Sequence, residues 1–465
     1  MHVIFAGARE VVGWLGVLDD PLLSYLGVSG EETGWFLAIV REAEARRFDV
    51  SWMRGMLREN AGRLFNPLRG LLVREYWRRL WVVQEIVHAK RVRLMCGSTS
   101  IVMGSLVRFL NAIFWATFDT PDEEIRVAAL KGVELFTLYF TPLQDHLSAM
   151  KHIVYLGNNK RCRDLRDKLF GVRSLLPEEL QECIDVDYSA SVGDVYASAT
   201  RKIIESVGAL DGILWRPFQW DQTELCGDLD IPTWAISLIE ENNMPTSECA
   251  LGNTFRASAG FPAFYSFSGR QLETRGVRIG VIRQSRMNNL GRDQRMAFRF
   301  SDFIKHSRSW LEKIRWPCAA ADIDRRTYAM TLLCGGWPEL VERVERNVFG
   351  EMDELDDIQD RRLGEMLLPL AEREAMIFEP TRAGLLSGPY AEEGTTFKYM
   401  GLTSNRWVFE GDVVCVLLGF KTPVILKPVG DKYELIGDAY IRIYMDGEAM
   451  AGFSGDVDEL ESFTL

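Results

Sequence analysis

The chain has 465 residues, of which 47% are hydrophobic and 26% charged, as is typical of globular proteins with two or three domains. Its net charge of −12, together with the lack of any Lys/Arg run, excludes a general nucleic-acid binder. The eight Cys and five His residues form no C-x-x-C pair and no metal-ligand spacing, so we expect no metal site and a reducing compartment.

The N-terminal stretch, MHVIFAGAREVV, gives no sign of export. It lacks the basic region and the long apolar region of a secretory signal. No apolar run in the chain approaches the roughly 20 residues of a membrane-spanning helix. We therefore expect a cytoplasmic chain without a membrane span.

Residues 32–48 are predicted to form an amphipathic helix, with a charged run at 41–47 on its solvated side. Its apolar side consists of Trp35, Phe36, Ile39 and Val40. Asn66 and Pro67 are expected to end the chain segment that precedes the next helix.

The most informative segment is residues 70–98, GLLVREYWRRLWVVQEIVHAKRVRLMCGS. On a helical wheel, residues 71–89 separate into an apolar face and a narrow polar stripe. The apolar face contains Leu72, Val73, Tyr76, Leu80, Val83 and Val87, and the stripe contains Arg74, Arg78, Trp81, Glu85 and His88. Residues 92–96 then alternate as a strand before Gly97 turns the chain. A helix that leads into a strand predicts half of an α/β unit.

The polar stripe has two interpretations. Such charges are usually solvated, and exposed ion pairs contribute only about 0.2–1 kcal/mol. Alternatively, a Glu on a rigid helix beside a Trp and cationic side chains can bind and act on a cationic or ribose-bearing ligand. The pattern alone leaves both interpretations open.

Residues 105–118 predict an apolar helix that packs in a core, and residues 119–159 predict helices of mixed polarity. A helix is expected within residues 187–204, capped by Ser191 with Asp194 completing a capping box. Its buried row is Val195, Ala199 and Ile203. Arg166, Asp167 and Lys168 suit either a ligand site or an ion-pair cluster, and we favour the ion-pair cluster.

The remaining chain alternates between β-rich and helical segments. Residues 255–282 predict a β-meander around Gly260, Gly269 and Gly276. Residues 292–379 predict helices, with a charge-dense acidic stretch at 339–360. Residues 411–441 predict a meander that packs as a small open barrel, with Gly430 and Asp431 as a two-residue hairpin turn. No structure is predicted after Gly452.

Residues 74–85, REYWRRLWVVQE, resemble the signature of the fungal heterokaryon-incompatibility (HET) domain, Arg-x-Trp-Phe-x-Arg-x-Trp-x-x-Gln-Glu. The matching residues are Arg74, Arg79, Trp81, Gln84 and Glu85. Tyr76 stands where the family has Trp.

Further blocks extend the resemblance. Residues 1–16 resemble the family's helix, strand and Trp-Leu-Gly turn, with the helix ending near Ala8. Residues 164–176 and 187–204 resemble two later blocks, and 445–449 (MDGEA) match a C-terminal one. Two family blocks that precede residue 1 do not occur in this sequence, so we expect the chain to begin part-way through the domain.

The resemblance implies a fungal protein of non-self recognition and programmed cell death. HET domains are distant relatives of TIR domains, some of which cleave NAD with a Glu that follows a Trp on a helix. This implies Glu85 as the catalytic residue, Trp81, Arg74 and Arg79 as binding residues for NAD or a related nucleotide, and no cofactor. Other incompatibility proteins, or a second copy of the chain, are the implied protein partners. A non-enzymatic recognition or assembly module and a catalytically incomplete fragment stay open as alternatives.

The predicted fold class is α/β, or α+β overall, with a truncated TIR-like HET core, helical additions and a β-rich C-terminal part. The expected parts are a HET core at 1–118, a helical extension at 119–210, a loop and β-meander region at 211–290, an acidic helical region at 291–390 and a β-rich element at 391–465.

Overall fold

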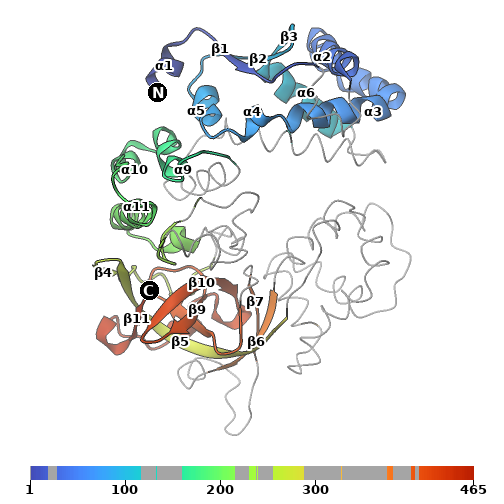
Figure 1. Ribbon diagram of the computed structural model, residues 1–465. Coiled ribbons are helices and arrows are strands. Elements are labelled where there is room, and N and C mark those ends of the chain that lie inside the picture. Colours follow the sequence, from blue (N-terminus) through green and yellow to red (C-terminus); the bar gives the residue numbers. More distant parts are fainter. Residues whose placement is uncertain are drawn as a thin grey trace. The chain divides into compact units, whose positions relative to one another are not determined.

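The computed structural model describes residues 2–18, 29–116, 132, 160–214, 230–236, 238, 255–286, 326, 374–380, 399–403 and 408–465. The chain divides into two compact units (Figure 1). Unit 1 is Met1–Tyr188 with Leu238–Asn243, and unit 2 is Ser189–Ser237 with Met244–Leu465. The fold is mixed α/β, as predicted, with helices dominating the N-terminal part and an antiparallel sheet in the C-terminal part. The five-part division made from the sequence stays a prediction.

Unit 1 contains a three-stranded sheet in the order β1-β2-β3. Strand β1 (Val11–Trp14) pairs in parallel with β2 (Val92–Cys96), and β2 pairs antiparallel with β3 (Thr99–Val102). The predicted strand at 92–96 is confirmed, because alternate residues Val92, Leu94 and Cys96 are buried. Gly97 begins the turn to β3 with φ of +55°, a conformation that glycine adopts without strain.

Helices α2 (Gly30–Ala45), α3 (Val50–Leu72) and α6 (Met103–Ala116) supply the core that covers the buried face of this sheet, and α1 (His2–Gly7) precedes β1. The predicted amphipathic helix at 32–48 is confirmed as α2. Ser29 caps it and Glu32 completes a capping box, satisfying two otherwise unpaired backbone N–H groups. Phe36 meets Phe109 edge-to-face at 5.7 Å between ring centroids.

The predicted single helix over 71–89 is wrong. The chain forms the last turn of α3, then α4 (Glu75–Arg78) and α5 (Val82–Val87). Extended backbone at Arg74 (ψ 142°) and Arg79 (ψ 129°) separates the three helices. The predicted apolar face is buried only in part. Tyr76, Leu80 and Val83 are buried, whereas Leu72, Val73 and Val87 are half-buried.

The predicted break at Asn66 and Pro67 is also wrong, because Pro67 lies inside α3. A proline inside a helix removes one backbone hydrogen bond and costs about 3 kcal/mol. The helix continues because Leu64, Leu68 and Leu71 are almost fully buried on both sides of Pro67, and their burial offsets that cost.

The last described part of unit 1 consists of α9 (Asp167–Phe170), the 3₁₀ turn η2 (Arg173–Leu175) and α10 (Glu178–Glu182). Residues 117–159 lie outside the described residues, apart from helical Gly132, so the helices predicted at 119–159 stay predictions. Among the described residues, no helix has the length and apolar character needed to cross a membrane.

Unit 2 begins with α11 (Val192–Val207) and the 3₁₀ turn η3 (Asp211–Leu214). The predicted cap at Ser191 is confirmed, because its side chain accepts a hydrogen bond from the Asp194 backbone N–H. The predicted capping box is not formed, because the Asp194 carboxylate accepts from the Ser191 hydroxyl at 2.6 Å and not from the Ser191 backbone N–H. The predicted row of Val195, Ala199 and Ile203 is buried.

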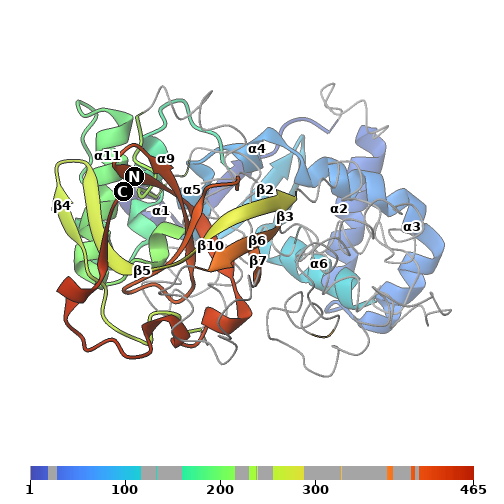
Figure 2. The same ribbon diagram turned by 90° about the horizontal axis from the view of Figure 1, so that it is seen from below.

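The sheet of unit 2 closes on itself. Its strands are β4 (Ser266–Ser268), β5 (Gln271–Arg286), β6 (Glu374–Pro380), β7 (Tyr399–Thr403), β8 (Val413–Leu417), β9 (Val424–Val429), β10 (Lys432–Tyr440) and β11 (Glu461–Thr464). The antiparallel pairings run β5-β6-β7-β10-β9-β8 and return to β5, so the expected small barrel is closed rather than open (Figures 1 and 2). The predicted hairpin turn at Gly430 and Asp431 is confirmed.

Three features of unit 2 differ from the predictions. Residues 374–380 form strand β6, where a helix was expected. The chain after Gly452 is ordered, because 3₁₀ turns such as η10 (Val457–Glu459) lead into β11, where Phe463 is fully buried. Gly276 lies inside β5, not at a turn between two strands, and β5 bends along the ring (Figure 2).

Gly276→Ala tests the closure of the ring. A Cβ at position 276 would lie 2.2 Å from the Val416 carbonyl oxygen and 2.8 Å from the Leu417 Cα, so β5 and β8 would have to separate. We expect a loss of about 2 kcal/mol or more in the free energy of unfolding, measured by urea denaturation. Gly212→Ala is the matched control, because nothing lies within 4 Å of its Cβ position. Equal urea midpoints for both variants would contradict the observed pairing.

Candidate functional site

The candidate site lies in the signature segment, residues 74–85, where α4 gives way to α5. A second segment of the chain holds this junction. The Lys160 ammonium donates to the Trp77 carbonyl at 2.6 Å, and the Leu80 N–H donates to the Arg161 carbonyl at 3.0 Å. Arg79 and Arg161 form a parallel β-bridge. Residues 160–161 therefore take the place of the helical hydrogen bonds that the junction lacks.

Three side chains of the segment point into the fold. The Gln84 amide, which is 5% exposed, donates to the Gly171 carbonyl at 2.7 Å. The Trp77 indole donates to the Leu71 carbonyl at 2.8 Å. Arg74, predicted as a nucleotide-binding residue, is 3% exposed and donates to the Val17 carbonyl at 2.9 Å. These contacts stabilise the fold, and a binding role for Arg74 stays a prediction.

Glu85 behaves differently because its side chain is half-exposed. Its Oε2 accepts a hydrogen bond from the Tyr76 hydroxyl at 3.4 Å, a long contact. Tyr76 is buried, with 6% of its surface exposed. Burial, and then the negative charge of Glu85, raise the pKa of Tyr76 well above its usual value, while the positive charge of Arg79 lowers it. Glu85, Tyr76 and Arg79 therefore form one electrostatic cluster.

Trp81 and Arg79 also reach solvent. Trp81 is half-buried and stands at the N-cap of α5, with its carbonyl accepting from the Glu85 N–H at 3.2 Å. This i, i+4 relation places the Trp81 and Glu85 side chains on one helical face. The Arg79 side chain is exposed and makes no hydrogen bond or ion pair with the described residues. The structure thus leaves an accessible carboxylate, an aromatic ring and a guanidinium within seven residues.

Two contributors to this cluster, Tyr76 and Gly13, were not predicted from the sequence. Tyr76 was assigned only to the buried face, and its contact with Glu85 depends on the break between α4 and α5. Gly13 in β1 was not singled out, yet a Cβ there would lie 2.6 Å from the Tyr76 hydroxyl oxygen. The sequence does carry a signal at Tyr76, because a tyrosine stands there where the HET signature has a tryptophan.

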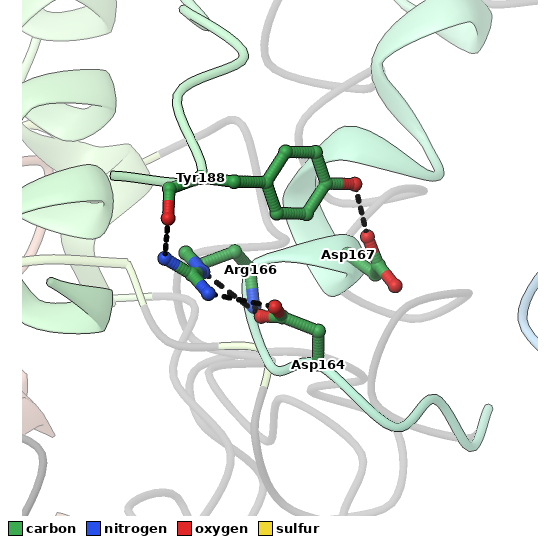
Figure 3. Close-up of polar contacts among 4 residues, drawn as sticks. All are labelled: Asp164, Arg166, Asp167 and Tyr188. Atoms are coloured by element: carbon green, nitrogen blue, oxygen red, sulfur yellow. Dashed lines mark hydrogen bonds and ion pairs between the residues drawn. The ribbon is translucent and has the colours of Figure 1, made fainter. Parts of the chain in front are cut away.

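A second polar cluster surrounds Arg166 (Figure 3). The Arg166 guanidinium pairs with the Asp164 carboxylate at 2.7 Å and donates to the Tyr188 carbonyl at 2.5 Å. The Tyr188 hydroxyl donates to Asp167 at 2.6 Å, which, followed by burial, raises the pKa of Tyr188 to about 12. Of the three residues predicted as one cluster, Arg166 pairs with Asp164, Asp167 accepts from Tyr188, and the buried Lys168 ammonium donates to the Lys160 carbonyl. Because these groups are satisfied within the fold, the contacts favour a structural role, as predicted, over a ligand site.

Among the described residues, no group of three or more His, Cys, Asp or Glu side chains is arranged to hold a metal ion. Comparisons of the chain with protein-family models, with curated proteins and with solved structures find no match. The site is therefore interpreted from its own geometry.

Gln84→Leu tests the structural role of the buried signature residues. The substitution removes the donor to the Gly171 carbonyl in a buried environment, which we expect to cost about 1–3 kcal/mol of stability. Gln181→Leu is the matched control, because it removes a similar bond to the Leu176 carbonyl from a half-exposed side chain that water can replace. Chemical denaturation of both variants measures the difference, and equal losses would contradict the role given to Gln84.

Lys160 predicts a pH dependence of stability. Burial lowers the pKa of Lys160 from 10.5 to about 8. Between these values the unfolded chain binds more protons at this group than the folded chain, so stability at this group rises with pH. We expect wild-type stability relative to Lys160→Met to rise by up to about 3 kcal/mol across that window. Lys90→Met, at an exposed lysine, is the control, and its stability difference from the wild type should stay flat across the same pH window. A difference that is flat or falls with pH would contradict the prediction.

Proposed function

We propose that this chain is a HET-like protein of fungal non-self recognition and programmed cell death that hydrolyses NAD or a related nucleotide. Its unit 1 would be a TIR-like core, in which helix α5 leads into strand β2 and β2 pairs in parallel with β1. The observation that carries the proposal is the accessibility of Glu85. The polar side chains of Arg74, Trp77 and Gln84 have buried partners, whereas Glu85 keeps solvent access.

The proposed chemistry uses the carboxylate as an electrostatic stabiliser. When the bond between ribose C1′ and the nicotinamide nitrogen breaks, positive charge develops on the sugar as an oxocarbenium ion. The Glu85 carboxylate, aimed at that charge, lowers the barrier, and water then adds to C1′ to release ADP-ribose and a proton. No redox partner is needed.

The neighbouring side chains have matching roles in binding. The Trp81 ring offers a flat apolar surface on the same helical face as Glu85, suited to stacking against a base. The exposed Arg79 guanidinium suits a phosphate group of the nucleotide. Arg74 would act indirectly, because its guanidinium is bonded to the Val17 carbonyl.

A non-enzymatic assembly module is the second candidate function, in which the chain binds another incompatibility protein or a second copy of itself. Val12 and Trp14, on one face of β1, are 51% and 52% exposed. Parallel strands are usually covered on both faces, so this exposed apolar face favours binding to another protein. A well-folded wild-type chain that leaves NAD intact and elutes as a dimer or larger species would favour this candidate.

Glu85→Gln separates the catalytic role from a structural one. The substitution removes the charge and keeps an acceptor for the Tyr76 hydroxyl, so we expect the melting temperature to stay nearly unchanged. The rate of NAD consumption by the purified chain should fall by a factor of about 100 or more.

The matched control is Glu75→Gln, which removes an exposed carboxylate of α4 that pairs with Arg78 at 3.2 Å. We expect it to keep the wild-type rate. A large drop in melting temperature for Glu85→Gln would instead identify Glu85 as a structural partner.

A further inference from the structure

We propose that Tyr76 is a positioning residue for Glu85, and that the absence of a side chain at Gly13 is what allows its hydroxyl to reach that carboxylate. This inference rests on the proposed function, which it deepens by naming the groups that orient the reacting carboxylate. Tyr76 is not proposed to touch the substrate, because its side chain is buried.

The Tyr76 ring is held rigidly. Its ring packs edge-to-face on Trp77 with centroids 5.1 Å apart, and the Trp77 indole is itself fixed by the Leu71 carbonyl. A buried ring held in this way presents its hydroxyl at a fixed point. Glu85 has three rotatable side-chain bonds and is half-exposed, so a fixed donor selects among its rotamers.

The two oxygens of the Glu85 carboxylate have different surroundings. The Tyr76 hydroxyl donates to Oε2 of Glu85. A carboxylate accepts several hydrogen bonds, so one oxygen can be held by the protein while the other faces a ligand. Holding a reacting group within a narrow range of geometry contributes directly to the rate.

Strand β1 leaves room for the Tyr76 hydroxyl at Gly13. An added Cβ at Gly13 would lie 2.6 Å from the Tyr76 hydroxyl oxygen, 2.8 Å from its Cζ and 3.1 Å from Leu94. The phenol therefore occupies the space that any side chain at position 13 would fill. Gly13→Ala leaves the Tyr76 hydroxyl in place chemically but displaces it. This variant therefore tests the contact independently of Tyr76→Phe.

The test combines a structural readout with a kinetic one. In a chain labelled with ¹³Cζ-tyrosine, the Tyr76 resonance is the one that disappears in Tyr76→Phe. We expect this resonance to shift in Glu85→Ala, because the carboxylate acceptor is lost, and in Gly13→Ala, because the hydroxyl is displaced. With NAD as substrate, Tyr76→Phe and Gly13→Ala should lower kcat about tenfold and leave KM within about twofold.

The chain offers a matched control for each variant. Tyr188→Phe removes a hydroxyl that donates to another carboxylate, that of Asp167, and should leave kcat unchanged. Gly7→Ala adds a methyl group where nothing lies within 4 Å. Thermal unfolding of every variant verifies that the chain is folded.

The outcomes separate the inference from the function on which it rests. A Tyr76 resonance that does not shift in Glu85→Ala overturns the inference, whether or not the chain consumes NAD. A resonance that shifts while Tyr76→Phe keeps the wild-type kcat overturns the positioning role alone. A wild-type chain that leaves NAD intact overturns the proposed function and, with it, the catalytic sense of the inference, whereas a shifted resonance together with a lowered kcat supports both.

Discussion

The pairing of Leu80 with Arg161 is the constraint on which the candidate site depends. In a continuous helix, residues nine apart lie on opposite faces and about 13.5 Å apart along the axis. Tyr76 and Glu85 are nine residues apart, so they meet only because α4 ends at Arg78 and α5 begins at Val82. The backbone groups freed by that break are taken up by residues 160–161, with Lys160 reaching back to the Trp77 carbonyl.

The same constraint divides the signature segment into two sets of residues. Arg74, Trp77 and Gln84 donate to backbone carbonyls and are buried, so their identity is explained by the fold. Arg79 and Glu85 keep access to solvent, and the fold gives no comparable reason for them. A match to a motif therefore does not by itself mark every matched residue as functional, and burial distinguishes the two sets.

The sequence predicted local elements better than it predicted their connections. Amphipathic periodicity identified α2, the Ser191 cap and a buried row identified α11, and apolar alternation identified β2, because those signals lie within or directly beside the elements themselves. The break between α4 and α5 was missed because the segment that holds it, residues 160–161, is about 80 residues away in the chain. Closure of the ring was missed for the same reason, since Val281 and Gly276 of β5 pair with Val413 and Leu417 of β8, 132 and 141 residues downstream. Of the candidate site, Glu85 and Trp81 were predicted from the motif, whereas the Tyr76 contact required the structure.

In the proposed function, the outward residues of the signature face a nucleotide and the inward ones do not. An NMR titration of the ¹⁵N-labelled chain with NAD tests this directly. The indole N–H signals of Trp81 and Trp77 are identified by their loss in Trp81→Phe and Trp77→Phe. We expect NAD to shift the Trp81 indole signal and to leave that of Trp77 unmoved, because the Trp77 N–H is bonded to the Leu71 carbonyl. A Trp81 signal that does not respond to saturating NAD would contradict the proposed function.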